Sequence, residues 1–100
     1  MSFEIIFAKR AQDERKELKA TPAKAGLPKQ INKALAYLQT NPRRSSLHTH
    51  VFSAFENPFE PAGKVFEAYA QNKTSGAYRI FWCYGPEKSQ ITIIAITLHP

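Results

Sequence analysis

Three stretches rich in β-branched and aromatic residues occupy the C-terminal third of the chain. They span 65–71, 77–84 and 91–98, and the segments between them, 72–76 and 85–89, contain Gly, Pro, Asn and Ser. Connections this short join only antiparallel neighbours, because a parallel crossover needs about a dozen residues or more. The pattern therefore predicts an antiparallel β-meander at the C-terminal end of the fold.

The N-terminal end of the chain begins with one predicted strand and one predicted helix. Residues 3–7 form a short apolar run that suits a strand. The charged stretch over 8–20 carries Ala11 and Leu18 seven residues apart, and Pro22 follows it. This pattern is typical of a helix that exposes most of its surface to solvent.

A second helix is predicted from Pro28 to the Asn41-Pro42 pair. Proline fits the first helical turn, where its missing N–H costs nothing. The apolar residues have the i, i+3, i+4, i+7 spacing of one helix face: Ile31, Ala34, Leu35 and Leu38. Residues 42–63 are irregular by composition, with 51–55 as a candidate short strand. The two helices are close enough in sequence to form an antiparallel hairpin.

These elements define an α+β fold class, and 100 residues suit a single domain over 1–100. The simplest packing lays the second helix on one side of the sheet and leaves the other side partly open. Strand alternation places Arg79 and Phe81 on one face of their strand. It also groups the residues of the last strand that share a face: Ile91, Ile93, Ala95, Thr97 and His99. A common face for Glu67, Arg79 and His99 depends on a cross-strand register that the sequence does not specify.

Charge and cysteine content narrow the class of protein. The net charge is +6, and residues 1–50 carry ten Lys and Arg against four Asp and Glu, whereas residues 51–100 carry four of each. A basic half attracts polyanions such as nucleic acid or an acidic partner, although a merely soluble basic protein has the same balance. The single cysteine, Cys83, excludes an internal disulfide or a thiolate metal cluster. With no visible signal peptide or membrane span, a cytoplasmic protein is expected.

The segment KVFEAYAQNKTSGAYRIFWCYGPEKSQITIIAITLHP resembles the end of the RelE/ParE toxin superfamily of bacterial toxin–antitoxin systems. The shared features are a strand, a Gly-containing turn, an aromatic followed by Arg in AYRIFW, another hairpin, and a last apolar strand ending in His. The order of the N-terminal strand, helical hairpin and basic linker is similar too. The resemblance implies a microbial-ribonuclease-like fold and a cognate antitoxin that neutralises the toxin. Many members cut mRNA in the ribosomal decoding site, and a gyrase-inhibiting branch does not cut RNA.

RNA cleavage without a metal needs a base for the 2′-OH, a cation for the phosphate and an acid for the leaving 5′-oxygen. The product is a 2′,3′-cyclic phosphate. The sequence has no clustered Asp, Glu and His pattern, so a route without metal or cofactor is preferred.

Three residues are the catalytic candidates. By its motif, Arg79 matches the arginine that clamps the scissile phosphate, and its alternative is an exposed arginine paired with a carboxylate. His99 matches the near-C-terminal histidine that acts as acid or base, and its alternative is a terminal histidine without a role. Glu67 is a candidate base, and its alternative is an ion pair with Arg79.

Eight further residues are candidates for RNA contact: Lys29, Lys33, Arg43, Arg44, His48, His50, Lys64 and Phe81. The alternative for the cations is an ordinary solvated surface. His48 and His50 are two residues apart, and without a third ligand nearby they favour a role in RNA contact or catalysis, or a plain surface loop, over a metal site. Phe81 is a candidate for base stacking, with core packing as its alternative.

The leading hypothesis is a ribosome-dependent mRNA endoribonuclease that inhibits translation and binds an antitoxin. A non-catalytic binder of the same superfamily, either a gyrase inhibitor or a degenerate toxin, is the alternative, because the central strands contain few basic residues and Pro100 stands where relatives often carry Arg or Tyr. A generic RNA-binding domain is a third hypothesis.

Overall fold

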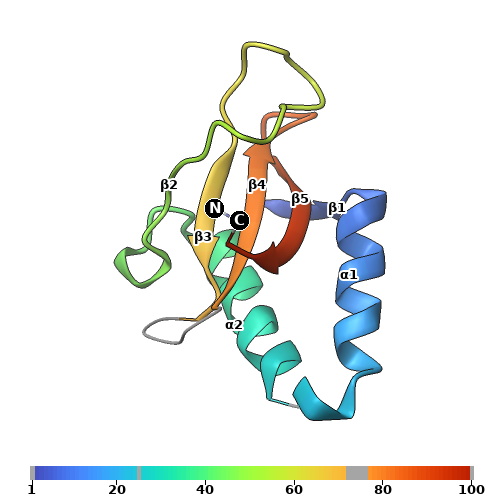
Figure 1. The fold of residues 1–100 in the computed structure, drawn as a ribbon. Helices are drawn as coiled ribbons and strands as arrows, with labels where there is room; N and C mark the ends of the chain where they lie inside the picture. Colours follow the sequence, from blue (N-terminus) through green and yellow to red (C-terminus); the bar gives the residue numbers. More distant parts are fainter. Residues whose placement is uncertain (1, 25, 72–76, 100) are drawn as a thin grey trace.

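A computed structural model describes residues 2–24, 26–71 and 77–99 of the chain (Figure 1). Its elements confirm the α+β class. In chain order they are β1 (Glu4–Phe7), α1 (Lys9–Lys19), the 3₁₀ turn η1 (Pro22–Lys24), α2 (Leu27–Thr40), the 3₁₀ turn η2 (Ser45–Leu47), β2 (His50–Val51), β3 (Phe66–Tyr69), β4 (Tyr78–Tyr84) and β5 (Gln90–Leu98). The predicted turn at 72–76 lies outside the described residues.

The five strands form one sheet in the order β1-β5-β4-β3-β2. The β3-β4-β5 meander is antiparallel, as predicted. The N-terminal strand joins this meander at its far edge, where β1 runs parallel to β5 and Ile5 lies opposite Ile91. The candidate strand at 51–55 is wrong for most of its length, because the chain leaves the sheet after the two-residue β2.

Both helices pack on the same face of the sheet, and the hydrophobic core lies between them and the strands. In Figure 1 they form an open hairpin against the sheet. Ile31 and Leu38 of α2 meet a layer of strand residues that are almost fully buried: Ile80, Trp82, Ile91, Ile93 and Ile96. Burying each large side chain of this kind contributes roughly 1.5–3 kcal/mol. The predicted apolar face of the second helix is therefore the face that forms the core.

A β-bulge changes the alternation of β5. Phe81 pairs with Ala95 and Trp82 pairs with Ile93, so Ile94 is an extra residue between the two pairs. The bulge reverses which face each later residue occupies. The prediction that every second residue from Ile91 to His99 lies on the same face of the strand is therefore wrong. Ile91 and Ile93 face the helices, whereas Ala95 pairs with Phe81 on the opposite face.

The sheet face away from the helices is covered at one end. Phe52 and Phe55, from the segment that follows β2, each place a ring 4.8 Å from the ring of Phe81. Arg10 of α1 adds a guanidinium 5.3 Å from the Phe55 ring. This face was expected to be partly open. At its other end, where β3 ends and β4 begins, the described residues leave His50 and His99 about half exposed.

A side chain of α1 completes the hydrogen bonding of β5. The pairing of β1 with β5 ends at Phe7 and Ile93. Further along β5, the backbone N–H of Ile96 donates instead to Glu14 Oε1 at 2.8 Å. A buried N–H would otherwise lack an acceptor, so this contact fixes α1 against the strand. No helix in the described ranges is long and apolar enough to cross a membrane.

Candidate active site

Four ionisable side chains meet at the open end of the sheet, on the face away from the helices. His50 of β2 lies directly opposite Glu67 of β3. Arg79 of β4 lies opposite Tyr69, two residues further along β3. His99 follows β5 and reaches the same place because the bulge at Ile94 turns its end of the strand to this face. The sheet register thus brings together Glu67, Arg79 and His99, the three catalytic candidates.

The carboxylate of Glu67 is the centre of this cluster and is only 1% exposed. Its Oε1 lies 2.6 Å from His50 Nε2, and its Oε2 contacts His99 Nδ1. Arg79 Nε is 3.8 Å from Oε2, which is an ion pair too long for a hydrogen bond. With both oxygens occupied and no access from solvent, Glu67 is not placed to take a proton from a substrate directly.

The ring of His50 has an acceptor on each side. Its Nδ1 lies 2.7 Å from the carbonyl oxygen of His48, and its Nε2 faces the Glu67 carboxylate. A neutral imidazole has only one N–H. His50 therefore satisfies both acceptors only as an imidazolium, unless Glu67 holds the proton. In the first case His50 adds a positive charge and offers no free nitrogen to a substrate.

His99 is held differently, because a single ring nitrogen is engaged. Nδ1 contacts Glu67, while Nε2 has no hydrogen-bond partner among the residues that the structure describes. The side chain is 53% exposed, and the edge of the Phe52 ring lies 5.9 Å from the imidazole. A carboxylate that accepts the Nδ1 proton fixes the tautomer with a lone pair on Nε2. His99 is thus the imidazole of the cluster that presents a reactive nitrogen.

Arg79 is held in place from several sides. Its Nη1 donates to the backbone oxygens of Gln71 at 3.0 Å and Tyr78 at 3.3 Å. Its guanidinium carbon lies 3.7 Å from the centre of the Tyr69 ring, and the side chain is 14% exposed. The guanidinium therefore lies within the cluster and away from the helices, with little freedom to move.

Tyr69 forms an aromatic wall that sequence reasoning missed. Besides Arg79, its ring contacts the rings of His48 at 4.9 Å and His50 at 6.1 Å. His48 has φ 50°, in the left-handed region, where the chain turns sharply after η2. The available signal was that Tyr69 and Glu67 share a strand face, since they are two residues apart.

The predicted RNA-contact residues are dispersed. His50 lies in the cluster and His48 lies beside it against the Tyr69 ring, while Lys33 and Arg44 line an adjoining pocket. The remaining cations lie elsewhere: Arg43 over the Phe66 ring, and Lys29 and Lys64 at exposed positions outside the cluster. Phe81, the candidate for base stacking, is fully buried, which leaves no face of its ring exposed to a base. Its place beside Phe52 and Phe55 supports the core-packing alternative.

The fold has counterparts among solved structures. A YoeB dimer from Staphylococcus aureus aligns over 100% of both chains with a TM-score of 0.65 at 14% identity. A YoeB/ParE toxin from Agrobacterium tumefaciens aligns over 98% of this chain and 100% of its own, with a TM-score of 0.69 at 11% identity. RelE from the archaeal RelE–RelB complex of Pyrococcus horikoshii aligns over 98% of this chain and 96% of its own, with a TM-score of 0.65 at 14% identity.

The sequence itself matches no protein-family profile and no curated protein. The structural similarity extends along almost the whole chain in each of these comparisons. The chain therefore shares the fold of these YoeB, YoeB/ParE and RelE structures, which confirms the expected fold and order of elements.

Proposed function

We propose that this protein is the toxin of a toxin–antitoxin system and cleaves mRNA on the ribosome, in the cytoplasm, without a metal. The observation that carries the proposal is the buried Glu67 carboxylate, which holds His99, His50 and Arg79 on the open end of one sheet face. Buried ionisable groups that converge in this way are typical of sites for proton transfer and anion binding.

The proposed reaction is an internal transesterification of RNA. The 2′-oxygen attacks the phosphorus as its proton passes to a base, and the bond from phosphorus to the 5′-oxygen breaks as that oxygen gains a proton. The products are a 2′,3′-cyclic phosphate and a 5′-hydroxyl. His99 transfers one of these protons through Nε2, and Glu67 is a positioning residue rather than the base. His48, exposed beside Tyr69, is the candidate for the other proton.

The charges of the cluster suit a phosphate. With the shared proton on His50 or on Glu67, the charges of Arg79, His50 and Glu67 add up to a net positive charge. Because Glu67 and Arg79 are largely removed from water, their field is screened less than that of a surface pair. Fixed cations of this kind stabilise the extra negative charge of a pentacoordinate phosphate.

An acidic antitoxin segment is the proposed protein partner, in a hetero-oligomer. Support comes from the positive charge of residues 1–50, which carry all of the net +6. The RelE chain of similar fold from P. horikoshii was solved in complex with RelB. A basic helical surface attracts an acidic chain over a long range at low salt.

The test is induced expression followed by primer extension on cellular mRNA. We expect wild-type protein to stop growth and to produce discrete mRNA cuts, and Arg79→Ala and His99→Ala each to lower cleavage about a hundredfold or more. His99→Gln keeps a polar side chain of similar reach but cannot exchange a proton, so it should be as inactive as His99→Ala.

Lys88→Ala is the matched control, because it removes a positive charge from the exposed turn before β5. It should remain as toxic as wild type at equal protein level. Circular dichroism and thermal melting identify any variant that fails to fold. If folded Arg79→Ala and His99→Ala cleave as fast as wild type, the assignment of the site is wrong.

A non-catalytic binder is the second candidate, and the low exposure of Arg79 favours it. A guanidinium that is 14% exposed and bonded to two backbone oxygens is also what a purely structural arginine shows. Under this alternative, induced cells continue to translate while DNA damage accumulates through gyrase inhibition. Pulse labelling of protein synthesis beside an assay of DNA breaks separates the two candidates.

A further inference from the structure

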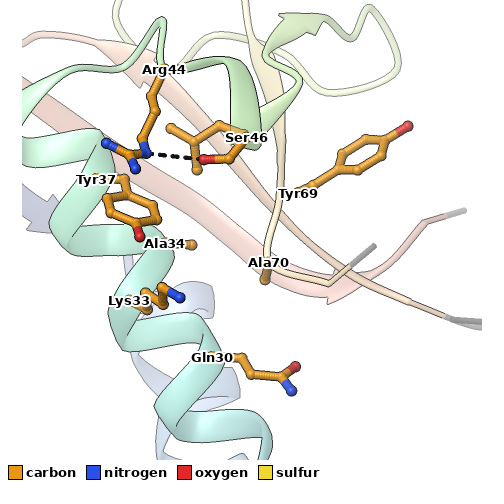
Figure 2. Close-up of a pocket in the computed structure, with 9 residues that line it drawn as sticks. Gln30, Lys33, Ala34, Tyr37, Arg44, Ser46, Tyr69 and Ala70 are labelled. Carbon is orange, nitrogen blue, oxygen red and sulfur yellow. Dashed lines mark hydrogen bonds between the residues drawn. The ribbon is translucent and has the colours of Figure 1, made fainter. Parts of the chain in front are cut away.

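A pocket of about 240 Å³ lies between α2, η2 and the end of β3 (Figure 2). Two cations line it, Lys33 from α2 and Arg44 from the segment before η2, and its nine lining residues include no Asp or Glu. Figure 2 shows Lys33, Tyr37 and Arg44 arranged along one wall, with Ala70 on the wall across from them. The pocket is therefore small and basic, with both polar and apolar side chains in its lining.

The exposed guanidinium of Arg44 is held by two contacts, and among the described residues it has no counter-ion. Its carbon lies 4.0 Å from the centre of the Tyr37 ring, and its Nε donates to Ser46 Oγ at 3.1 Å. Lys33 Nζ lies 5.9 Å from the same ring. Neither cation forms an ion pair with any residue that the structure describes. A cation fixed before its anion arrives loses less conformational entropy on binding.

The pocket and the candidate active site share Tyr69. This residue lines the pocket and also carries Arg79 against its ring at 3.7 Å. The pocket lies on the helix side of the sheet and Arg79 on the other side. Tyr69 touches both, so an RNA strand that runs from Arg79 around Tyr69 reaches the pocket. A planar guanidinium also matches the oxygens of a phosphate in a bidentate way.

We propose that this pocket is a second phosphate subsite, in which Arg44 and Lys33 bind the phosphate next to the scissile one in the substrate RNA. The inference rests on the proposed function. An acidic peptide that binds as a helix is the less suitable occupant, because a bound helix usually needs an extended apolar groove, and this pocket is short and carries two cations.

The experiment measures single-turnover cleavage of ribosome-bound mRNA that has one major cut site. Arg44→Ala and Lys33→Ala are compared with Lys88→Ala and Lys19→Ala, which remove the same charge at exposed positions outside the pocket. We expect roughly a tenfold loss of kcat/KM for Arg44→Ala, as is typical of a lost charged hydrogen bond. Lys33→Ala should lose less, and the two control variants should match wild type.

A neutral linkage in the mRNA locates the contact. Replacing one phosphate at a time by a methylphosphonate should slow the wild type at a linkage adjacent to the cut by the same factor as Arg44→Ala. At that linkage the variant should lose nothing more, because the two changes remove one interaction. If the losses from the methylphosphonate and from Arg44→Ala add up at every linkage, the proposed subsite is wrong.

Two other outcomes separate the hypotheses. If wild type cleaves and Arg44→Ala cleaves equally well, the subsite is wrong and the proposed function stands. If Arg44→Ala cleaves normally but loses binding to a short poly-glutamate peptide, the pocket binds protein instead. A folded wild type that cleaves no ribosome-bound mRNA would overturn the proposed function itself.

Discussion

The two faces of the sheet are built from different chemistry. On the helix side, the strand residues are apolar and almost fully buried, as in Ile80, Trp82 and Ile96. On the other side, the same strands bury Glu67 and hold Arg79 beside it. One face gains stability from the removal of apolar surface from water, whereas the other buries charge, which rarely adds stability and is typical of a functional site.

The far face is itself divided in two. At one end, Phe52 and Phe55 close over Phe81 and form a small aromatic cluster. At the other end the chain leaves His50 and His99 about half exposed. The aromatic cover thus holds the strands on this side, while the charged end is left accessible to a ligand. If the two faces differ in this way, substitutions on the helix face should reduce stability most, and substitutions at the charged end of the far face should reduce activity most.

Trp82→Ala is the largest expected effect and tests the helix face. Trp82 is fully buried and stacks on Phe66 at 4.8 Å, so its truncation should cost about 3–5 kcal/mol of the free energy of unfolding. Urea denaturation measures this loss. Tyr84→Ala is the control on the same strand face, since Tyr84 is 41% exposed and should cost far less. Similar losses for the two variants would show that the helix face does not dominate stability.

The helices and the meander could be predicted from local patterns. The i, i+3, i+4, i+7 spacing of Ile31, Ala34, Leu35 and Leu38 places the buried face of α2 correctly. The short connections between the runs rich in β-branched residues correctly predict that β4 pairs antiparallel with β3 and β5. The parallel pairing of β1 with β5 could not be predicted, because it joins segments more than eighty residues apart and depends on tertiary packing.

The candidate site was only partly predictable, and the bulge explains why. Strict alternation places His99 on the face of Ile91 and Ile93, which is the helix face. The extra residue Ile94 reverses that assignment, and no local signal in a run of β-branched residues reveals a bulge. The motif resemblance indicated Arg79 and His99, and position on a neighbouring strand indicated Glu67. The burial of Glu67 and the contacts of Tyr69 follow from register, which the sequence does not encode locally.

Glu67→Gln has an intermediate expected effect and tests the charged end. The amide leaves Arg79 and His50 without their carboxylate in a largely buried place. We expect a loss of about 1–3 kcal/mol in the free energy of unfolding at neutral pH. Cleavage should fall more steeply than stability, because His99 loses the acceptor that fixes its ring.

Urea denaturation and mRNA cleavage, measured on the same preparation, separate these two effects. Glu87→Gln changes an exposed carboxylate before β5 and serves as the control for both assays. A fully active Glu67→Gln would mean that the carboxylate does not position His99. An unchanged free energy of unfolding would mean that the buried charges do not depend on one another.

Titration of Cys83 gives the smallest expected effect on the free energy of unfolding. It tests whether the covered end of the far face excludes water as completely as the helix face does. The thiol is fully buried, and burial raises its pKa from 9.0 to about 11. The unfolded chain therefore loses the thiol proton first as pH rises. The resulting loss of stability begins near pH 9, ends near pH 11, and is absent at neutral pH.

The measurement compares wild type and Cys83→Ala by urea denaturation at pH 8 and pH 10. The alanine variant leaves the same cavity at both pH values, so the cavity cancels from the change between them. At pH 10 the titration should cost wild type about 1 kcal/mol that the variant does not lose. At pH 8, a thiol reagent should label Cys83 only as fast as the protein unfolds. Labelling at the rate of a free thiol would show that the cover over Cys83 opens in the native state, and the far face would then be unlike the helix face along its whole length.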